Sequence, residues 1–314
     1  MVPVILVIIA VVYFLSQSQD KITENISSLS EDDREYRNYD TFTKVDSISI
    51  PVFHPDVMEE NYPSPEIPWI ALIIDDFGPY GSAALVDGFL KLPLEITFAV
   101  IPGYPKTEAI GKKVVEAGHE LFIHMPMEPT KPVAMDEKYM LLVQNSLEDV
   151  TDMFNKAMLE LPGASGVNNH MGSKATNNDT LMLKLAEVLK SRNLVFIDSR
   201  TVPRSRALPA MRKKGVAALG RDVFIDNEKD TLYIENQLDE LVRIAERRGW
   251  AIGIGHANPA TLSVLNDFIT KRDLSYITFI RASNLIKSVQ DMRIKQAEFA
   301  GLPVKRNPNP LDGE

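Results

Sequence analysis

Short apolar segments recur along the chain, and helix-like segments separate them. The apolar or β-branched runs are WIALIIDD, LEITFAVIP, ELFIHMPM, GVNNHM, LVFIDSR, DVFID, WAIGIGH and ITFIRAS, at residues 69–76, 94–102, 120–127, 166–171, 194–200, 222–226, 250–256 and 277–283. Between most of them, apolar residues are spaced three and four apart and Asn, Ser or Thr stands near the start, as in amphipathic helices. The pattern therefore predicts eight strands that alternate with helices.

The spacing of these segments indicates the topology. Strand and helix alternate at intervals of about 25 to 30 residues, apart from a longer gap between the third and fourth strands, which is typical of parallel βα units. About 230 residues with seven or eight such units fit a (β/α) barrel. We therefore predict an α/β fold built as a barrel of seven to eight parallel strands, with a doubly wound open sheet as the alternative.

The two ends of the chain differ from this middle part. Residues 1–18 begin with the uncharged apolar run MVPVILVIIAVVYFL, which is short for a transmembrane helix and suits a signal peptide or a short membrane anchor. Residues 19–67 are polar and acidic, as in a linker, and residues 296–314 form a proline-rich tail. The folded domain is expected at 68–295. We expect an exported protein, periplasmic or tethered to the membrane through its N-terminus and facing the periplasm.

The composition of the chain limits which partners and which metal ligands it can use. The 314 residues carry a net charge of −9, so the chain lacks the basic surface that binding to nucleic acid requires. There is no cysteine, which excludes disulfides, thiolate nucleophiles and cysteine-ligated zinc. Histidine, aspartate and glutamate are therefore the strong metal ligands that remain.

Seven ionisable residues lie at or near the ends of predicted strands: Asp75, Asp76, His124, His170, Asp198, Asp226 and His256. Because the carboxyl ends of parallel barrel strands face one rim, these side chains are expected to gather there. Two adjacent carboxylates that end an apolar strand are costly to bury unless a cation compensates them. Asp76, His124 and His170 form an Asp-His-His set that suits a divalent, zinc-like ion.

Ordinary structural roles remain open for some of these residues. The adjacent aspartates stand in DDFGP, which is also good turn chemistry. His256 could be a neighbour of a helix cap, because it precedes a predicted helix start. Asp226 could be an ordinary aspartate at the end of a strand. His119 comes before the third strand, so we expect it at the opposite end of the barrel with a structural role.

Five motifs, in this order, resemble those of the polysaccharide deacetylase superfamily, and specifically its divergent polysaccharide deacetylase branch of bacteria: IALIIDDFG, GHELFIHMPMEP, GVNNHMGS, FIDSRT and GIGH. The match spans roughly residues 68 to 285. The resemblance implies a distorted (β/α) barrel and a metal-dependent hydrolysis of N- or O-acetyl groups on a sugar polymer. It also implies roles for four residues. Asp75 matches the general base, Asp76 the metal-binding carboxylate, His124 the first metal histidine and His256 the general acid.

Two departures from the superfamily concern the metal and the base. Glu128 stands where a second metal histidine is usual, and the third motif lacks the usual arginine. We hypothesise that His170 replaces the missing histidine, with Glu128 as the alternative third ligand, and that Arg200 replaces the arginine that orients the base. Asn169 is a further candidate. Asp198 is expected to orient His256 or to contact the substrate.

These residues predict a zinc-dependent hydrolase that removes acetyl groups from an envelope or extracellular polysaccharide, with an acetylated carbohydrate as its partner. A second hypothesis is a carbohydrate-binding envelope protein that keeps the deacetylase fold but has lost turnover. A third is a hydrolase of another amide or of glycosidic bonds. Glycoside cleavage is less favoured, because adjacent aspartates do not by themselves flank a glycosidic bond.

Overall fold

A curled sheet of parallel strands forms the centre of the chain. The computed structural model describes residues 65–79, 82–131 and 137–299. The strands are β1 (Trp69–Phe77), β2 (Ile96–Val100), β3 (Glu120–Met127), β4 (Gly166–Met171), β5 (Val195–Asp198), β6 (Ala218–Gly220), β7 (Val223–Phe224), β8 (Trp250–His256) and β9 (Thr278–Phe279). Eight of them follow the order β6-β5-β4-β3-β2-β1-β8-β7, and every pairing is parallel. The predicted distorted (β/α) barrel is confirmed.

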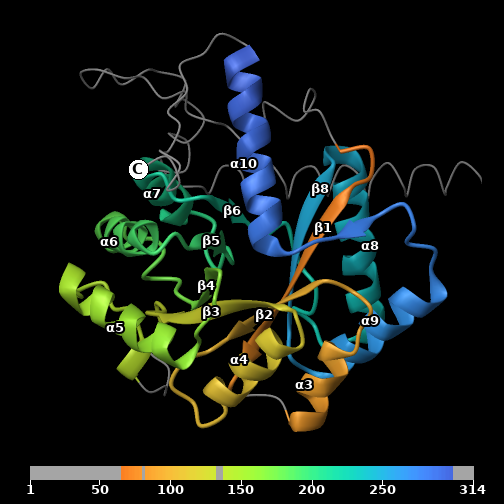
Figure 1. Cartoon of the computed structure of the whole chain (residues 1–314), viewed down its shortest axis with the longest axis horizontal. Coiled ribbons are helices and arrows are strands. Elements are labelled where there is room, and N and C mark those ends of the chain that lie inside the picture. Colours follow the sequence, from red (N-terminus) through yellow and green to blue (C-terminus); the bar gives the residue numbers. More distant parts are fainter. Residues whose placement is uncertain (1–64, 80–81, 132–136, 300–314) are drawn as a thin grey trace, which may run out of the picture. The chain divides into compact units, whose positions relative to one another are not determined.

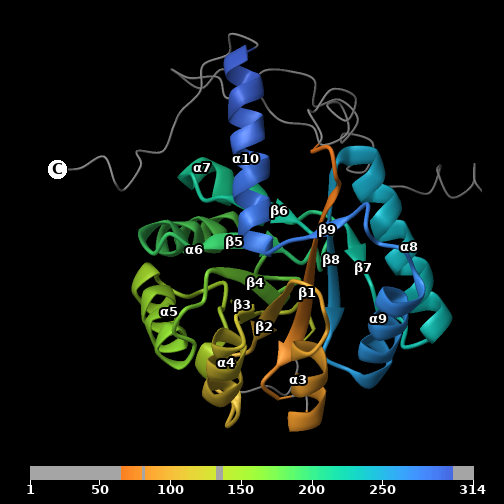
Figure 2. The ribbon, with the colours of Figure 1, turned by 45° about the vertical axis from the view of Figure 1, so that its right-hand side comes forward.

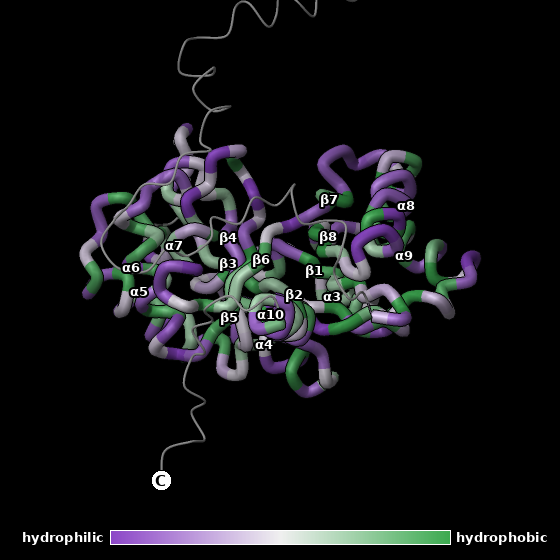
Figure 3. The backbone as a smooth tube through the Cα atoms, turned by 90° about the horizontal axis from the view of Figure 1, so that it is seen from above, coloured by the Kyte–Doolittle hydropathy of each residue, from purple (hydrophilic) through white to green (hydrophobic). Residues whose placement is uncertain are grey.

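Helices lie around the outside of this sheet (Figures 1 and 2). They are α3 (Ala83–Leu90), α4 (Thr107–Glu116), α5 (Leu147–Glu160), α6 (Asp179–Ser191), α7 (Ala207–Lys214), α8 (Thr231–Arg248), α9 (Pro259–Lys271) and α10 (Ala282–Phe299), with a short 3-10 helix at Glu137–Tyr139. Their ends follow local chemistry. Asn178 and Asn258 cap α6 and α9 through their side-chain oxygens, and glycines in the left-handed region end α7 and α8. α8 alternates between hydrophilic and hydrophobic residues, as expected for a helix with one buried face (Figure 3).

Successive strand residues point to opposite sides of the sheet. In β1, Ile70, Leu72 and Ile74 pack under the surrounding helices, whereas Ala71 and Ile73 belong to a second cluster inside the barrel. This inner cluster also takes residues from β2, β3, β5, β6 and β8. The barrel is therefore packed through its centre, and side chains on the inner face above this cluster are free to form a site.

The barrel is open between β6 and β7, which do not pair. The two residues that connect these strands attach to opposite sides of the opening. The Arg221 N–H donates to the carbonyl of Asp198 at 3.0 Å, and the Asp222 N–H donates to the carbonyl of Ile252 at 2.9 Å. Backbone hydrogen bonds from a short loop thus replace the missing strand pairing.

The first turns of α10 close the other end of the barrel. Ala282, Leu285 and Ile286 join the inner cluster, and in both ribbon views the far end of α10 stands away from the sheet (Figures 1 and 2). The buried Glu120 carboxylate accepts hydrogen bonds from Thr97 Oγ1 at 2.6 Å and from the Ser283 N–H at 3.3 Å. A carboxylate at a helix N-terminus satisfies its free N–H groups, which holds α10 at the base.

Two strands differ from the prediction. β6 was not predicted, because its three residues are too short to give a periodic signal. The segment 277–283, predicted as a strand, forms only the two-residue β9 before α10 begins at Ala282. β9 pairs with Trp69 and Ile70 alone, since β2 takes the same edge of β1 from Leu72 onward.

The predictions for the two ends of the chain lie largely outside the described residues. The signal peptide or anchor at 1–18 and nearly all of the linker and tail, 19–67 and 296–314, fall there. The domain boundaries therefore stay predictions. Among the residues that the structure does describe, none of the helices has the length and apolar character needed to span a bilayer.

Gly166, the first residue of β4, provides a test of the inner packing. A Cβ atom at this position would lie 2.4 Å from the Phe122 ring and 2.7 Å from Val195 Cγ2. We expect Gly166→Ala to lower the free energy of unfolding by about 1 to 3 kcal/mol, as overpacking does. Urea denaturation measures this. Adding Phe122→Leu should recover part of the loss, and two purely additive losses would contradict the packing explanation.

Candidate functional site

Asp75 and Asp76 both face the inside of the barrel, although adjacent strand residues normally face opposite ways. β1 is irregular here: its pairing register with β2 shifts between Ile74 and Phe77, and Asp76 has a φ of 68°. A bulge of this kind re-aims a side chain, and the left-handed conformation costs about 1 kcal/mol or more. As a result Asp75 Oδ2 and Asp76 Oδ1 lie 3.5 and 3.3 Å from the same atom, His124 Nε2.

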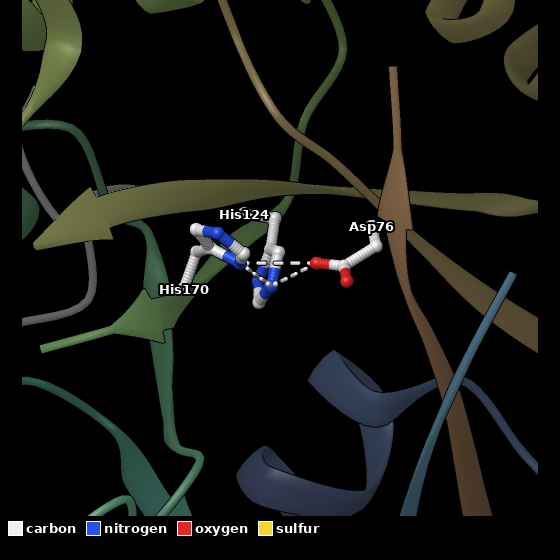
Figure 4. A group of neighbouring side chains, drawn as sticks. All are labelled: Asp76, His124 and His170. Carbon is white, nitrogen blue, oxygen red and sulfur yellow. Dashed lines mark hydrogen bonds and ion pairs between the residues drawn. The ribbon is translucent and has the colours of Figure 1, made fainter. Parts of the chain in front are cut away.

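His124 and His170 come from neighbouring strands. In the register of β3 and β4, His124 lies opposite Asn168 and Pro126 lies opposite His170. His170 Nδ1 is 3.1 Å from His124 Nε2 and 3.0 Å from Asp76 Oδ1. Figure 4 shows the two imidazoles and the carboxylate converging from three strands on one point. The three residues predicted as metal ligands are therefore brought together.

The chemistry of this group fits a divalent metal ion. Ligand atoms about 2.0 to 2.1 Å from a tetrahedral zinc are roughly 3.3 to 3.4 Å from one another. The three atoms here are separated by 3.0 to 3.3 Å. Asp76 Oδ1 is buried, yet no hydrogen bond of normal geometry reaches it. Burial opposes ionisation of Asp76, but the two imidazoles hold the pKa of its carboxyl well below the usual range. An ionised carboxylate with a free oxygen is what a cation requires.

Asn168 connects the base to a metal ligand. Its Nδ2 donates to Asp75 Oδ1 at 2.8 Å, and its Oδ1 accepts from His124 Nδ1 at 2.9 Å. The second contact places the proton of His124 on Nδ1 and leaves the Nε2 lone pair for a metal. Asn168 was not among the residues predicted from the sequence. The two-residue period of a strand was the available signal, because it places Asn168 on the same face as His170.

Asp75 is buried beside these groups, with 3% of its surface exposed. Burial raises the pKa of the Asp75 carboxyl, although His124, His256 and the Asn168 amide act in the opposite direction. A carboxylate with a raised pKa holds a proton more readily than an ordinary surface aspartate. Asp75 is therefore suited to accept a proton inside the barrel.

His256 ends β8, where it lies opposite Asp75 in the register with β1, and its side chain is held by Asp226. Its Nδ1–H donates to Asp226 Oδ1 at 2.8 Å, and its Nε2 lies 4.0 Å from Asp76 Oδ2. The other oxygen of Asp226 accepts from the His256 N–H, Asn258 Nδ2 and Thr261 Oγ1. Burial opposes charging of the imidazole, but the hydrogen bond to Asp226 and its charge raise the pKa of His256 to about 9. His256 is thus oriented and protonated at neutral pH.

Asp198 does not occupy the orienting position that the sequence suggested for it. Its Oδ1 accepts the Arg200 N–H at 2.8 Å, which closes the turn after β5. Asp226, which the sequence placed only at the rim, makes the contact with His256. Arg200 does not make the contact with the base either. Its guanidinium lies over Gly220, while Asn168 bonds to Asp75.

Glu128 and Asn169 lie apart from the metal-ligand group. Glu128 Oε1 is 2.5 Å from Lys174 Nζ, and Oε2 accepts the Val143 N–H at 2.8 Å. Both oxygens therefore hold surface loops. Asn169 points to the opposite side of β4, where its Oδ1 accepts the Ser199 N–H at 2.8 Å. Of the two predicted alternatives for the third ligand, the structure groups His170 with Asp76 and His124.

The fold and this arrangement agree with a family comparison. A family model described as divergent polysaccharide deacetylase matches residues 72–286. The chain therefore belongs to the divergent polysaccharide deacetylase family, and the resemblance noted in its motifs is confirmed.

Individual relatives are similar over most of the folded region. The chain is 34% identical over 223 residues to the uncharacterized protein YibQ of Escherichia coli K12, which covers 70% of this chain and 68% of YibQ. An uncharacterized protein of Haemophilus influenzae is 34% identical over 198 residues, or 62% of this chain and 69% of that protein. The crystal structure of an uncharacterized protein from Agrobacterium tumefaciens C58 shares the fold, with a TM-score of 0.65 and 20% identity over 72% of this chain and 92% of the other.

The ligand group leads to a metal-binding prediction. We expect His170→Ala to weaken zinc binding by more than about 100-fold. Even residues that only hydrogen-bond to a metal ligand change metal affinity by about 10- to 100-fold, and the loss of a ligand itself should cost more. Glu128→Gln should bind zinc as the unaltered protein does. Isothermal titration with Zn²⁺ after chelator treatment measures both. Full zinc retention in His170→Ala, or loss in Glu128→Gln alone, would reverse the assignment.

The His256–Asp226 pair predicts a pH dependence of the metal-free protein. A histidine whose pKa is raised from 6.5 to about 9 stabilises the fold fully below pH 6.5, and this stabilisation is lost as the pH rises toward 9. We expect the free energy of unfolding to fall over this interval, and to fall less in Asp226→Asn. Urea unfolding from pH 6 to 9 measures it. Equal slopes in the two proteins would argue against the pair.

Proposed function

We propose that this protein is a metal-dependent hydrolase that removes acetyl groups from carbohydrate. The observation that carries the proposal is the placement of two proton-transfer groups, Asp75 and His256, beside one candidate metal centre. Asp75 Oδ2 lies 3.5 Å from His124 Nε2, and Nε2 of His256, which Asp226 holds, lies 4.0 Å from Asp76 Oδ2. Membership of the deacetylase family supports the choice of an acetyl group.

Asp75 is the proposed general base. Its carboxylate is buried, its pKa is raised by that burial, and Asn168 holds one of its oxygens. The other oxygen, Oδ2, remains directed toward His124 Nε2 and the centre of the site. In this position Asp75 takes a proton from the attacking water while the network around it keeps the carboxylate still.

His256 is the proposed general acid. Its pKa of about 9 leaves the imidazolium protonated at neutral pH, and Asp226 fixes Nδ1 so that Nε2 carries the transferable proton toward the site. About a third of the His256 side chain is exposed, so a substrate reaches it from solvent. His256 then protonates the leaving nitrogen or oxygen of the sugar.

Asp76, His124 and His170 would hold the metal, for which zinc is our proposal. When bound, a divalent ion of this kind polarises a carbonyl oxygen and lowers the pKa of a coordinated water toward about 7. For this ion the chain would supply one carboxylate oxygen from Asp76 and one imidazole nitrogen each from His124 and His170. Export to the periplasm also remains a proposal, since it rests on residues 1–18.

Acetate release tests the function. Zinc-loaded protein, incubated with a panel of acetylated glycans and peptidoglycan fragments, should release acetate from at least one of them. Asp75→Asn and His256→Gln should each lower kcat by about 10²- to 10⁴-fold, the usual contribution of a proton-transfer group. His119→Gln serves as control, because His119 lies before β3 and bonds to the carbonyl of Leu90.

Two results would contradict the proposal. Undiminished turnover in both Asp75→Asn and His256→Gln would remove the assigned chemistry. Binding of a glycan without acetate release from any substrate would favour the carbohydrate-binding alternative.

A further inference from the structure

Two arginines lie at the same rim as the candidate site and take no part in the proposed reaction. Arg200 follows β5 by two residues, and Arg221 comes directly after the last residue of β6. Asp198 and Gly220 face each other in the β5–β6 register, so the two arginines leave neighbouring strand ends. Because the strands are parallel, this rim is the one that carries His170 and His256.

Contacts between side chains link Arg221 to the candidate general acid. Its Nε–H donates to the carbonyl of Ser199 at 2.9 Å, which fixes the guanidinium. The guanidinium carbon lies 4.7 Å from the centre of the Phe224 ring, and that ring lies 5.0 Å from the His256 ring in an edge-to-face contact. The Arg221 charge is therefore held one aromatic ring away from His256.

Arg200 is held beside Arg221 at a cost. Its φ is 51°, in the left-handed region, and its guanidinium lies over Gly220, where a Cβ would be 2.4 Å from Arg200 Nε. Any side chain at 220 would force the Arg200 guanidinium to move away. Burial lowers the pKa of Arg221 and the charge of Arg200 lowers it further, although the carboxylates of Asp198 and Asp75 act in the opposite direction. The positive charges of Arg200 and Arg221 therefore lie close enough to repel each other.

No carboxylate among the described residues forms an ion pair with either guanidinium. Arg200 is exposed and Arg221 is half-buried. Arginine stays protonated even when its pKa falls, so the two positive charges persist. The arrangement leaves a positive edge beside a site that is otherwise made of carboxylates and imidazoles.

Ser199 adds an independent observation. Its side chain is nine-tenths buried, and its Oγ has no hydrogen-bond partner in the part of the chain that the structure describes. Ser199 directly follows Asp198, the last residue of β5, and precedes Arg200. A buried hydroxyl without a partner costs roughly 1 to 3 kcal/mol. This hydroxyl belongs to the turn whose carbonyl holds Arg221.

We propose that Arg200, Arg221 and Ser199 form a subsite for an anionic group of the substrate, a carboxylate or phosphate on the sugar next to the acetylated one. The inference rests on the proposed function, because it extends the same site to a substrate class. Guanidinium groups pair with carboxylate and phosphate oxygens in planar, two-point contacts, and a hydroxyl can donate to the same oxyanion. Because only the Phe224 ring separates Arg221 from His256, a charged substituent on a sugar bound beside His256 would lie next to these arginines.

Kinetics with a matched pair of substrates test the subsite. The first substrate is a disaccharide of N-acetylglucosamine and glucuronic acid, and the second is the same disaccharide with its carboxylate reduced to the alcohol. We expect Arg200→Gln to lower kcat/KM for the acidic disaccharide by roughly 10- to 100-fold, the effect of losing a charge-assisted hydrogen bond. The value for the neutral disaccharide should stay within about twofold. Arg243→Gln, an exposed arginine of α8, removes the same charge and should change neither value.

A binding measurement separates this inference from the proposed function, because it needs no turnover. Glucuronate and inorganic phosphate are titrated into the metal-free protein and followed by NMR shifts of the Arg200, Arg221 and Ser199 amides. Saturable shifts that vanish in Arg200→Gln but persist in Arg243→Gln would support the subsite, even if no acetate were released from any glycan. The glucuronate and phosphate arms distinguish the two kinds of anion.

Arg221→Lys is a control for loss of folding. It keeps the positive charge at residue 221 but removes the planar guanidinium contact. It should fold with an unchanged melting temperature and still bind both anions, more weakly than the unaltered protein. The subsite is overturned if Arg200→Gln lowers kcat/KM equally for the acidic and neutral disaccharides. It is also overturned if neither anion produces shifts beyond those of chloride at equal ionic strength.

Discussion

Two adjacent carboxylates face the same interior only because β1 is irregular where it ends. A regular strand would turn Asp76 toward the surrounding helices, where its charge would have no partner. The register shift and the left-handed backbone at Asp76 place both carboxylates within 3.5 Å of His124 Nε2. The strained backbone at Asp76 thus positions the ligands, and the whole candidate centre depends on this conformation.

Burial of this much charge is tolerable because nearly every polar group is paired. Asn168 satisfies Asp75 and His124 at once, and Asp226 receives four hydrogen bonds from His256, Asn258 and Thr261. The exception is Asp76 Oδ1, which lies between two imidazole nitrogens without a hydrogen bond. In a network that is otherwise complete, one unpaired ionised oxygen marks the position where a cation fits.

The open side of the barrel shapes the rest of the rim. Because β6 and β7 do not pair, the short loop between them must reach both neighbouring strands, and its backbone does so through Arg221 and Asp222. The Arg221 side chain is then directed along the rim, over Phe224 and next to Arg200. The irregularity that distorts the barrel thus also supplies the positive edge of the site.

The amino-acid sequence by itself determined the strand and helix alternation, the parallel barrel and the residues that end its strands, because these follow from local periodicity and from the shared direction of parallel strands. It also singled out Asp76, His124 and His170 as a ligand set. Tertiary structure alone decided which partner each residue has: Asp226 rather than Asp198 for His256, and Asn168 rather than Arg200 for Asp75. A bulge, a two-residue strand and a side-chain contact between distant strands depend on packing across the barrel, and no local pattern in the sequence encodes them.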